Sequence, residues 1–266
     1  MTAPAPRQTL LPPISDPTVH AELDRLARRY VDAGGLGMEV LSAIGGSAEG
    51  AMKHLPAVIR SRIDRITLRA LESAMRAAST SRRVVRDRGD LANRLISTAS
   101  GAMGGIAGLP GAMLELPLTV TTLMRALLAI AAEHGLDPDS EEVRMECLRV
   151  FATAGPFAED DGTDMGLLAA KLSITGQTLQ GLLVRVAPKL GAVLGQKLAA
   201  QATPLLGAVA GASINYTFAS YYQEIARVHF GLLRLRDETG LPKEALVEAL
   251  RERVEAMQVK RTVRRA

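Results

Sequence analysis

The chain has 266 residues, which is long enough to bury a hydrophobic core. Hydrophobic residues make up 47% of the sequence and charged residues 23%, a balance that excludes an intrinsically disordered chain. There are four Phe, four Tyr and no Trp, so Ala, Leu, Val, Ile and Met must fill most of the core. Because Ala and Leu are strong helix formers, the composition predicts an all-α multi-helix bundle without a significant sheet.

The net charge of +4 is unevenly distributed along the chain. Residues 60–94 hold ten Arg against four acids, residues 135–164 hold nine acids against two Arg, and residues 251–266 hold six bases against two acids. A basic block can be a solvated helix face, or it can meet anionic lipid, nucleic acid or an acidic partner. No helix-turn-helix, zinc or aromatic-interleaved motif accompanies the arginines, so we expect no nucleic-acid partner.

Cysteine usage and the N-terminal residues favour a cytoplasmic protein. The single cysteine, Cys147, excludes an internal disulfide framework and is expected to be a small buried side chain. Residues 1–16 are rich in proline and lack the basic start and apolar core of a signal peptide, so they are expected to form a flexible leader. A single helical domain is expected over residues 17–257, followed by a basic tail over residues 258–266.

The first two helices have clear sequence signals. Asp16 can cap a helix that begins at Pro17, and Gly34 and Gly35 are expected to end it. A long amphipathic helix is expected from about residue 57 to about residue 85, because apolar residues recur there at helical spacing with arginines on the other face.

Prolines and glycines also delimit the helices that follow. Pro117 is expected to begin a deeply buried helix that ends at Gly135, with His134 interacting with its C-terminal dipole. Asp137 is a plausible cap for the next helix, which carries acids near its first turns. An acidic loop then leads to two or three helices separated by Pro188, Pro204 and Gly240, and a last amphipathic helix precedes the tail.

Residues 95–117 form a helix-length apolar segment built largely from small residues. On a helix, residues three and four apart share a face, so its glycines would form two adjacent rows without side chains. Such rows let another helix backbone approach closely. The predicted partner is the segment from Gly207 to Asn215, which lies within a second uncharged stretch, residues 198–223. The tripeptide at 109–111, Leu-Pro-Gly, is expected to break the helix or to begin the next one. The glycines predicted to make the contact are Gly101, Gly104, Gly105, Gly108, Gly111, Gly207 and Gly211.

Both segments have the length of a membrane span, but Ser, Thr, Gly, Asn and Gln make them weakly hydrophobic. Buried core helices of a soluble bundle are therefore favoured over true spans. Peripheral or conditional insertion into a membrane stays open as a third interpretation.

Three polar residues are candidates for a ligand site or for a structural contact. Glu115 is the sole charge between Arg94 and Arg125, and a carboxylate in such a setting is paired, for example with Arg125, or has a raised pKa. Asn215 lies in an apolar run and must be hydrogen-bonded if it is buried. A structural pair that holds the two Gly-rich segments together is favoured over a functional pocket.

Two stretches are similar to a known family. The sequence GAMGGIAGLPGAMLELPLTVTTLMRALLAIAAEHGLDPDSEEVRMECLRVFA resembles the central block of the EcsC family. The sequence TPLLGAVAGASINYTFASYYQEIARVHFGLLRL resembles its C-terminal block, where Gly207, Gly211 and Asn215 match the Gly-Gly-Asn spacing. The similarity runs from about residue 60 to about residue 240. It implies a cytoplasmic or membrane-associated protein and carries over no active site.

No motif indicates a reaction. Nucleotide-binding, zinc-protease and nucleophile-elbow patterns are absent, and the four histidines have no metal-ligand spacing. The acidic loop at residues 157–166 fails the template of a calcium-binding EF-hand. We therefore expect no cofactor, no metal and no catalytic residue, with enzymatic activity left undecided.

The expected function is that of a non-enzymatic, membrane-peripheral protein at the inner face of the membrane. It would engage an anionic membrane surface or an integral membrane protein such as a transporter. The alternative is an enzyme or carrier that acts on an apolar or lipid-like ligand bound between the Gly-rich helices. The sequence predicts no particular oligomeric state.

Overall fold

The computed structural model describes residues 14–43, 62–84, 108–152, 178–201 and 207–265. Over these ranges the chain forms seven α-helices and no strand, which confirms the predicted all-α architecture. In chain order the helices are α1 (Pro17–Ala43), α4 (Ile63–Val84), α6 (Gly108–Glu133), α7 (Glu141–Phe151), α9 (Leu179–Gln201), α10 (Gly207–Thr239) and α11 (Lys243–Arg265).

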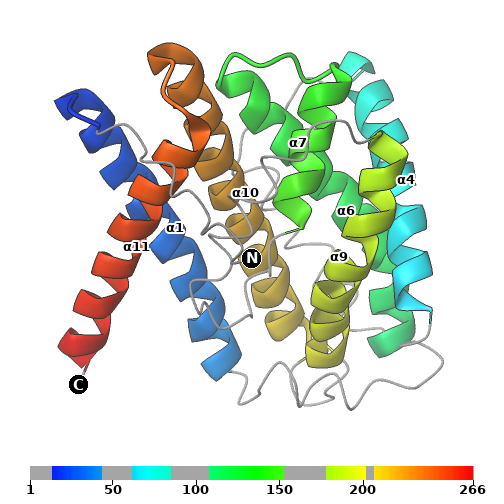
Figure 1. Ribbon diagram of the computed structural model, residues 1–266. Coiled ribbons are helices and arrows are strands. Elements are labelled where there is room, and N and C mark those ends of the chain that lie inside the picture. Colours follow the sequence, from blue (N-terminus) through cyan, green and yellow to red (C-terminus); the bar gives the residue numbers. More distant parts are fainter. Residues whose placement is uncertain (1–13, 44–61, 85–107, 153–177, 202–206, 266) are drawn as a thin grey trace, which may run out of the picture.

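The bundle is organised around α10, which is the longest helix with 33 residues. It contacts α1, α6, α7, α9 and α11. Figure 1 shows α1 and α11 on one side of α10, and α4, α6, α7 and α9 on the other. All seven helices contribute buried apolar side chains to one core, and the ring of Tyr222 packs there against Phe151 with centroids 5.3 Å apart.

Helix α1 begins as predicted but ends later. Asp16 caps it by accepting a hydrogen bond from the backbone N–H of Thr18 at 2.8 Å, and Pro17 is the first helical residue. The prediction that Gly34 and Gly35 end the helix is wrong, because α1 continues to Ala43. A glycine inside a helix costs only about 1 kcal/mol relative to Ala, and tertiary packing of the helix outweighs so small a local preference.

Two prolines lie inside helices rather than at their ends. Helix α6 begins at Gly108, so the Leu-Pro-Gly step begins this helix, and the prediction that Pro117 starts it is wrong. Pro188, expected to separate helices, lies inside α9. Both prolines are exposed, so their rings face solvent while the other face of each helix stays packed in the core.

The glycine ends of α6 and α10 are confirmed. Gly135 and Gly240 have φ values of 79° and 68°, the left-handed conformation that glycine adopts without a steric penalty. The ring nitrogen Nδ1 of His134 lies 2.8 Å from the carbonyl oxygen of Ile130, in agreement with the predicted place of this histidine at the helix end.

Helix α4 lies within the predicted amphipathic segment, and α7 has a different cap from the predicted one. Ser140, not Asp137, caps α7 by accepting a hydrogen bond from the N–H of Val143 at 3.2 Å. The Asp137 carboxylate instead accepts from the N–H of Asp139 and closes the preceding turn. Cys147 is fully buried in α7, as predicted.

Among the described helices, α6 contains a stretch that is long and apolar enough to cross a membrane, Leu116–Glu133. This stretch is 61% buried inside the protein, where α4, α7, α9 and α10 pack around α6. The observed burial confirms the prediction of a deeply buried helix. Core helices of folded proteins pass the same test of length and composition, so the stretch alone does not indicate a membrane span.

Candidate functional site

Four exposed arginine side chains follow one line on the surface of α4. They are Arg62, which directly precedes the helix, and Arg65, Arg69 and Arg76 within it. At 3.6 residues per turn they fall within an arc of about 60° around the helix axis and extend over about 21 Å. We call these four residues the arginine stripe. The apolar residues of α4 occupy the opposite side of the helix and are buried in the core.

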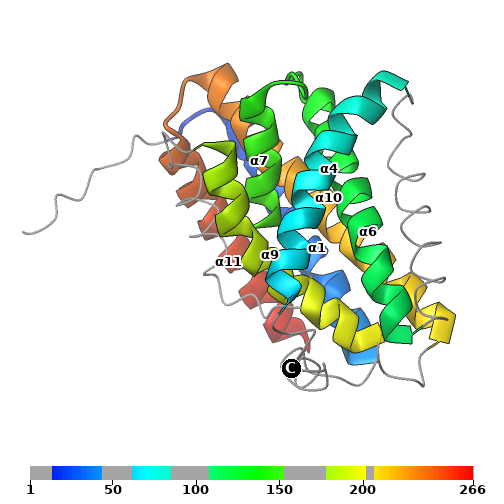
Figure 2. The ribbon, with the colours of Figure 1, turned by 90° about the vertical axis from the view of Figure 1, so that its right-hand side faces the viewer.

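Helix α9 lies antiparallel to α4 and very close to it. Near the start of α4, a Cβ atom placed on Gly191 would lie 2.7 Å from Oδ1 of Asp64. Farther along, the side-chain amide of Gln180 donates to Glu72 at 3.4 Å. A side chain at position 191 would therefore have to displace the Asp64 carboxylate, although the Asp64 Cα atom lies at an ordinary contact distance of 3.6 Å. The two helices lie side by side facing the viewer in Figure 2.

Helix α9, which packs beside α4, also has an exposed side. Its outermost side chains are small and apolar: Val184, which is 53% exposed, Pro188 and Ala192. The exposed bases Arg185 and Lys189 lie beside them, one helical turn apart, on the side of α9 that is turned away from Gly191. Together, α4 and α9 present six bases and the two acids Asp64 and Glu72, a surface that we call the α4–α9 face.

Charge on the α4–α9 face is less compensated than charge elsewhere in the bundle. In the described part of the chain, Arg62, Arg65, Arg69 and Lys189 make no ion pair. The arginines of α1, α10 and α11 differ, because ion pairs join most of them to neighbouring carboxylates. These pairs include Arg25–Glu22, Arg29–Glu224, Arg234–Glu22, Arg251–Glu248 and Arg253–Asp24.

The structure places the predicted polar candidates only in part. Asn215 lies on α10 and is 1% exposed, and Arg125 lies on α6, half-buried, with its Nε atom buried and without a hydrogen-bond partner among the described residues. Glu115 belongs to the N-terminal half of α6, but its side chain is outside the described part. Its predicted pairing with Arg125 stays a prediction.

The predicted glycine contact is likewise only partly visible. Helices α6 and α10, which carry four of the seven predicted contact glycines, do pack against each other. Gly108 and Gly111 lie at the start of α6, and Gly207 and Gly211 at the start of α10. Gly101, Gly104 and Gly105 lie outside the described residues, so the contact between the rows stays a prediction.

A buried ionic cluster, which was not predicted from the sequence, joins α7 to α10. Oε2 of Glu146 lies 2.6 Å from Nε2 of His229, and Oε1 accepts a hydrogen bond from Arg149. The three residues are 6%, 1% and 9% exposed, respectively. The helical spacing of Glu146 and Arg149 is a signal that could have suggested their pairing, but nothing local links them to a histidine in α10.

The electrostatics of this cluster hold Glu146 in its charged form. Burial acts to raise the pKa of Glu146, but the hydrogen bond from His229 and the charges of His229, Arg149 and Lys243 outweigh it, and the pKa lies at about 2. Burial is also the largest influence on Lys243, whose pKa is lowered to about 8 despite the attraction of Glu146. Because the cluster is sealed from solvent, it stabilises the packing of α7 on α10 rather than forming an accessible binding site.

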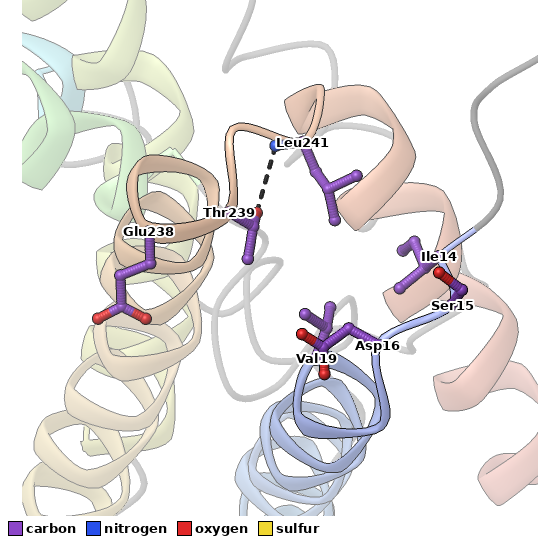
Figure 3. A pocket seen from close by; sticks show the side chains of 7 residues that line it. All are labelled: Ile14, Ser15, Asp16, Val19, Glu238, Thr239 and Leu241. Carbon is purple, nitrogen blue, oxygen red and sulfur yellow. Dashed lines mark hydrogen bonds between the residues drawn. The ribbon is translucent and has the colours of Figure 1, made fainter.

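A pocket of about 280 Å³ lies between the start of α1 and the turn that joins α10 to α11 (Figure 3). Two of its polar side chains already have partners: Thr239 accepts from the N–H of Leu241, and Asp16 caps α1. The lining residues are Ile14, Ser15, Asp16, Val19, Glu238, Thr239 and Leu241. No group of three or more His, Cys, Asp or Glu side chains within the described ranges could hold a metal ion.

The protein is therefore an all-α helical bundle. It has a basic surface on α4 and α9 and a buried ionic cluster between α7 and α10. The model of the EcsC protein family matches residues 61–235. The chain belongs to this family, which confirms the resemblance seen in its glycine, proline and asparagine pattern. No curated protein and no solved structure matches the chain in the same comparisons. Helices α1 and α11 lie outside the matched region.

Proposed function

We propose that the protein is a non-enzymatic, membrane-peripheral protein that binds anionic membrane surfaces through the α4–α9 face. The observation that carries the proposal is the arginine stripe, a row of exposed guanidinium groups on one side of a single helix. Guanidinium groups form paired hydrogen bonds with phosphate oxygens. Each base near an anionic membrane contributes about 1 kcal/mol to binding.

The shape and chemistry of the face favour a bilayer over a nucleic acid. Two helices lying side by side present a broad surface, and the apolar side chains of Val184, Pro188 and Ala192 lie among its bases. Proteins that bind single-stranded nucleic acids stack bases on aromatic rings, and the described part of this face carries none. Lipid headgroups require only that cationic side chains and small apolar groups reach the same plane.

The test is co-sedimentation of the full chain with phosphatidylcholine vesicles that contain or lack phosphatidylglycerol. We expect binding only to the anionic vesicles, and a loss of binding at high salt because the ions screen exposed charges. The double variant Arg65→Gln/Arg69→Gln removes two adjacent bases of the stripe. At about 1 kcal/mol per base, its affinity should fall about 30-fold.

A matched control removes the same charge from the other side of the bundle. Arg28 and Arg251 are surface residues of α1 and α11, so Arg28→Gln/Arg251→Gln should bind anionic vesicles nearly as well as the unmodified chain. Equal losses in the two double variants would contradict the assignment to the α4–α9 face. Failure of the unmodified chain to bind at low salt, or binding of duplex DNA without binding of vesicles, would overturn the proposal.

A further inference from the structure

Helix α11 is fastened to α1 by a polar contact that we call the α1–α11 clasp, formed by His20, Asp24 and Arg253. Nε of Arg253 donates to Oδ1 of Asp24 at 2.9 Å, and a terminal nitrogen of the same guanidinium donates to Nδ1 of His20. The other terminal nitrogen donates to the carbonyl oxygen of Ala249 at 2.7 Å. On the far side of the imidazole, Nε2 of His20 lies 2.9 Å from the carbonyl oxygen of Ile14.

These partners fix the protonation state of His20. A guanidinium has only donors, so Nδ1 must accept and must therefore carry a lone pair. A backbone carbonyl only accepts, so Nε2 must carry the proton that it donates to Ile14. The clasp is thus compatible only with the neutral imidazole protonated at Nε2. A proton added at Nδ1 would point at the donors of Arg253 and place two positive charges in contact.

Protonated His20 has another partner within reach. Asp24 lies four residues after His20 on the same face of α1, so Nδ1–H of the imidazolium can turn to this carboxylate. The charged groups around His20 are Asp16 and Asp24 on α1 and Arg253 on α11. Glu238 of α10 lines the neighbouring pocket, whose lining does not include His20. Protonation would therefore exchange a bond between two helices for a bond within one helix.

We propose that protonation of His20 opens the α1–α11 clasp, so that the second half of α11, from about residue 249, separates more readily from the bundle. The crossing of α1 and α11 at the edge of the bundle is visible in Figure 1. Once the clasp is open, the buried side chains of Leu250 and Val254 and the partly buried Met257 still pack this half of the helix against the core. Imidazole side chains commonly change charge between about pH 5 and about pH 8, so mild acidification is the expected trigger.

Hydrogen exchange of the full chain, followed by mass spectrometry at about pH 7.5 and about pH 5.5, tests the proposal. After correction for the intrinsic pH dependence of exchange, protection of residues 249–260 should fall about tenfold at the lower pH. Protection of the central part of α10 should stay the same. Unchanged protection of residues 249–260 between the two pH values would overturn the proposal.

Three variants separate the clasp from other effects of acid. His20→Gln keeps an acceptor for Arg253 but does not titrate, so the pH dependence should disappear while protection at the higher pH is retained. Arg253→Gln removes the cationic donor, so protection should be low at both pH values. His134→Gln is the matched control, because it removes a half-buried histidine at the end of α6 and should retain the tenfold change. A tenfold change that persists in His20→Gln would refute the assignment to His20.

Discussion

Replacing Glu146 with Gln is expected to destabilise the fold strongly, because two buried donors share this carboxylate. His229 lies 2.6 Å from one of its oxygens, and Arg149 donates to the other. Gln offers one acceptor oxygen, and its amide N–H groups would face the second donor. Since His229 is 1% exposed and Arg149 is 9% exposed, water cannot readily replace the lost partner.

Two independent routes give similar magnitudes for this loss. Breaking a buried ion pair by removing one partner costs about 3–5 kcal/mol. The pKa of Glu146 lies at about 2, against an ordinary value of 4.5. At about 1.4 kcal/mol per pKa unit, that depression corresponds to about 3 kcal/mol of stabilisation of the folded state.

The sign of the pH dependence follows from the lowered pKa. Because the carboxyl group of Glu146 binds its proton less tightly in the folded state, its stabilising contribution is fully present above about pH 4.5 and is lost as the pH falls toward about 2. Urea denaturation should therefore show a difference of about 3 kcal/mol in unfolding free energy between the unmodified chain and Glu146→Gln at neutral pH. This difference should shrink in acid.

A control from the same helix calibrates the measurement. Glu141 is exposed in the first turn of α7, so Glu141→Gln should cost less than about 1 kcal/mol, the usual range for a surface acid near a helix N-terminus. A loss below about 1 kcal/mol in Glu146→Gln, or a difference that does not diminish at low pH, would refute the account of the buried cluster.

Two further predictions concern packing and a shifted lysine. A Cβ at Gly231 would lie 2.8 Å from Cδ2 of the fully buried Leu26, so Gly231→Ala should destabilise by about 1–3 kcal/mol. Gly34→Ala, with nothing within 4 Å of its Cβ, should instead stabilise by up to about 1 kcal/mol; equal effects in thermal unfolding would contradict this distinction. Amine labelling of Lys243 should be half-maximal near pH 8, because burial outweighs the attraction of Glu146. The midpoint should move lower in Glu146→Gln, and a move to higher pH would argue against this electrostatic account.

Features of the fold that depend on local chemistry could be predicted from the sequence. The ends of α6 and α10 at Gly135 and Gly240 follow from the left-handed conformation that only glycine adopts easily, and Asp16 caps α1 through neighbouring backbone atoms. The end predicted at Gly34 failed because a penalty of about 1 kcal/mol is small compared with the packing of a whole helix. The prediction that Pro117 begins α6 failed for a related reason, since the helix begins nine residues earlier and continues through this proline.

The basic face was predictable to a smaller extent. The arginine-rich block was visible in the sequence, and the helical period could place Arg65 and Arg69 on one side of a helix. The contribution of α9 was not predictable, because it depends on the packing of α9 beside α4, a contact between helices that are distant along the chain. The link between Glu146 and His229 was also invisible, since it joins residues in helices that are distant along the chain.

The region that identifies the family has consequences for where the chain can be cut. It ends at residue 235, within α10, and it excludes α1. Yet Leu26 of α1 fills the space beside Gly231, and Arg29 of α1 binds Glu224. A fragment limited to residues 61–235 would lose both contacts and would expose the apolar side of α10 to water. Such a fragment is expected to aggregate, so the fold requires helices that the family pattern does not include.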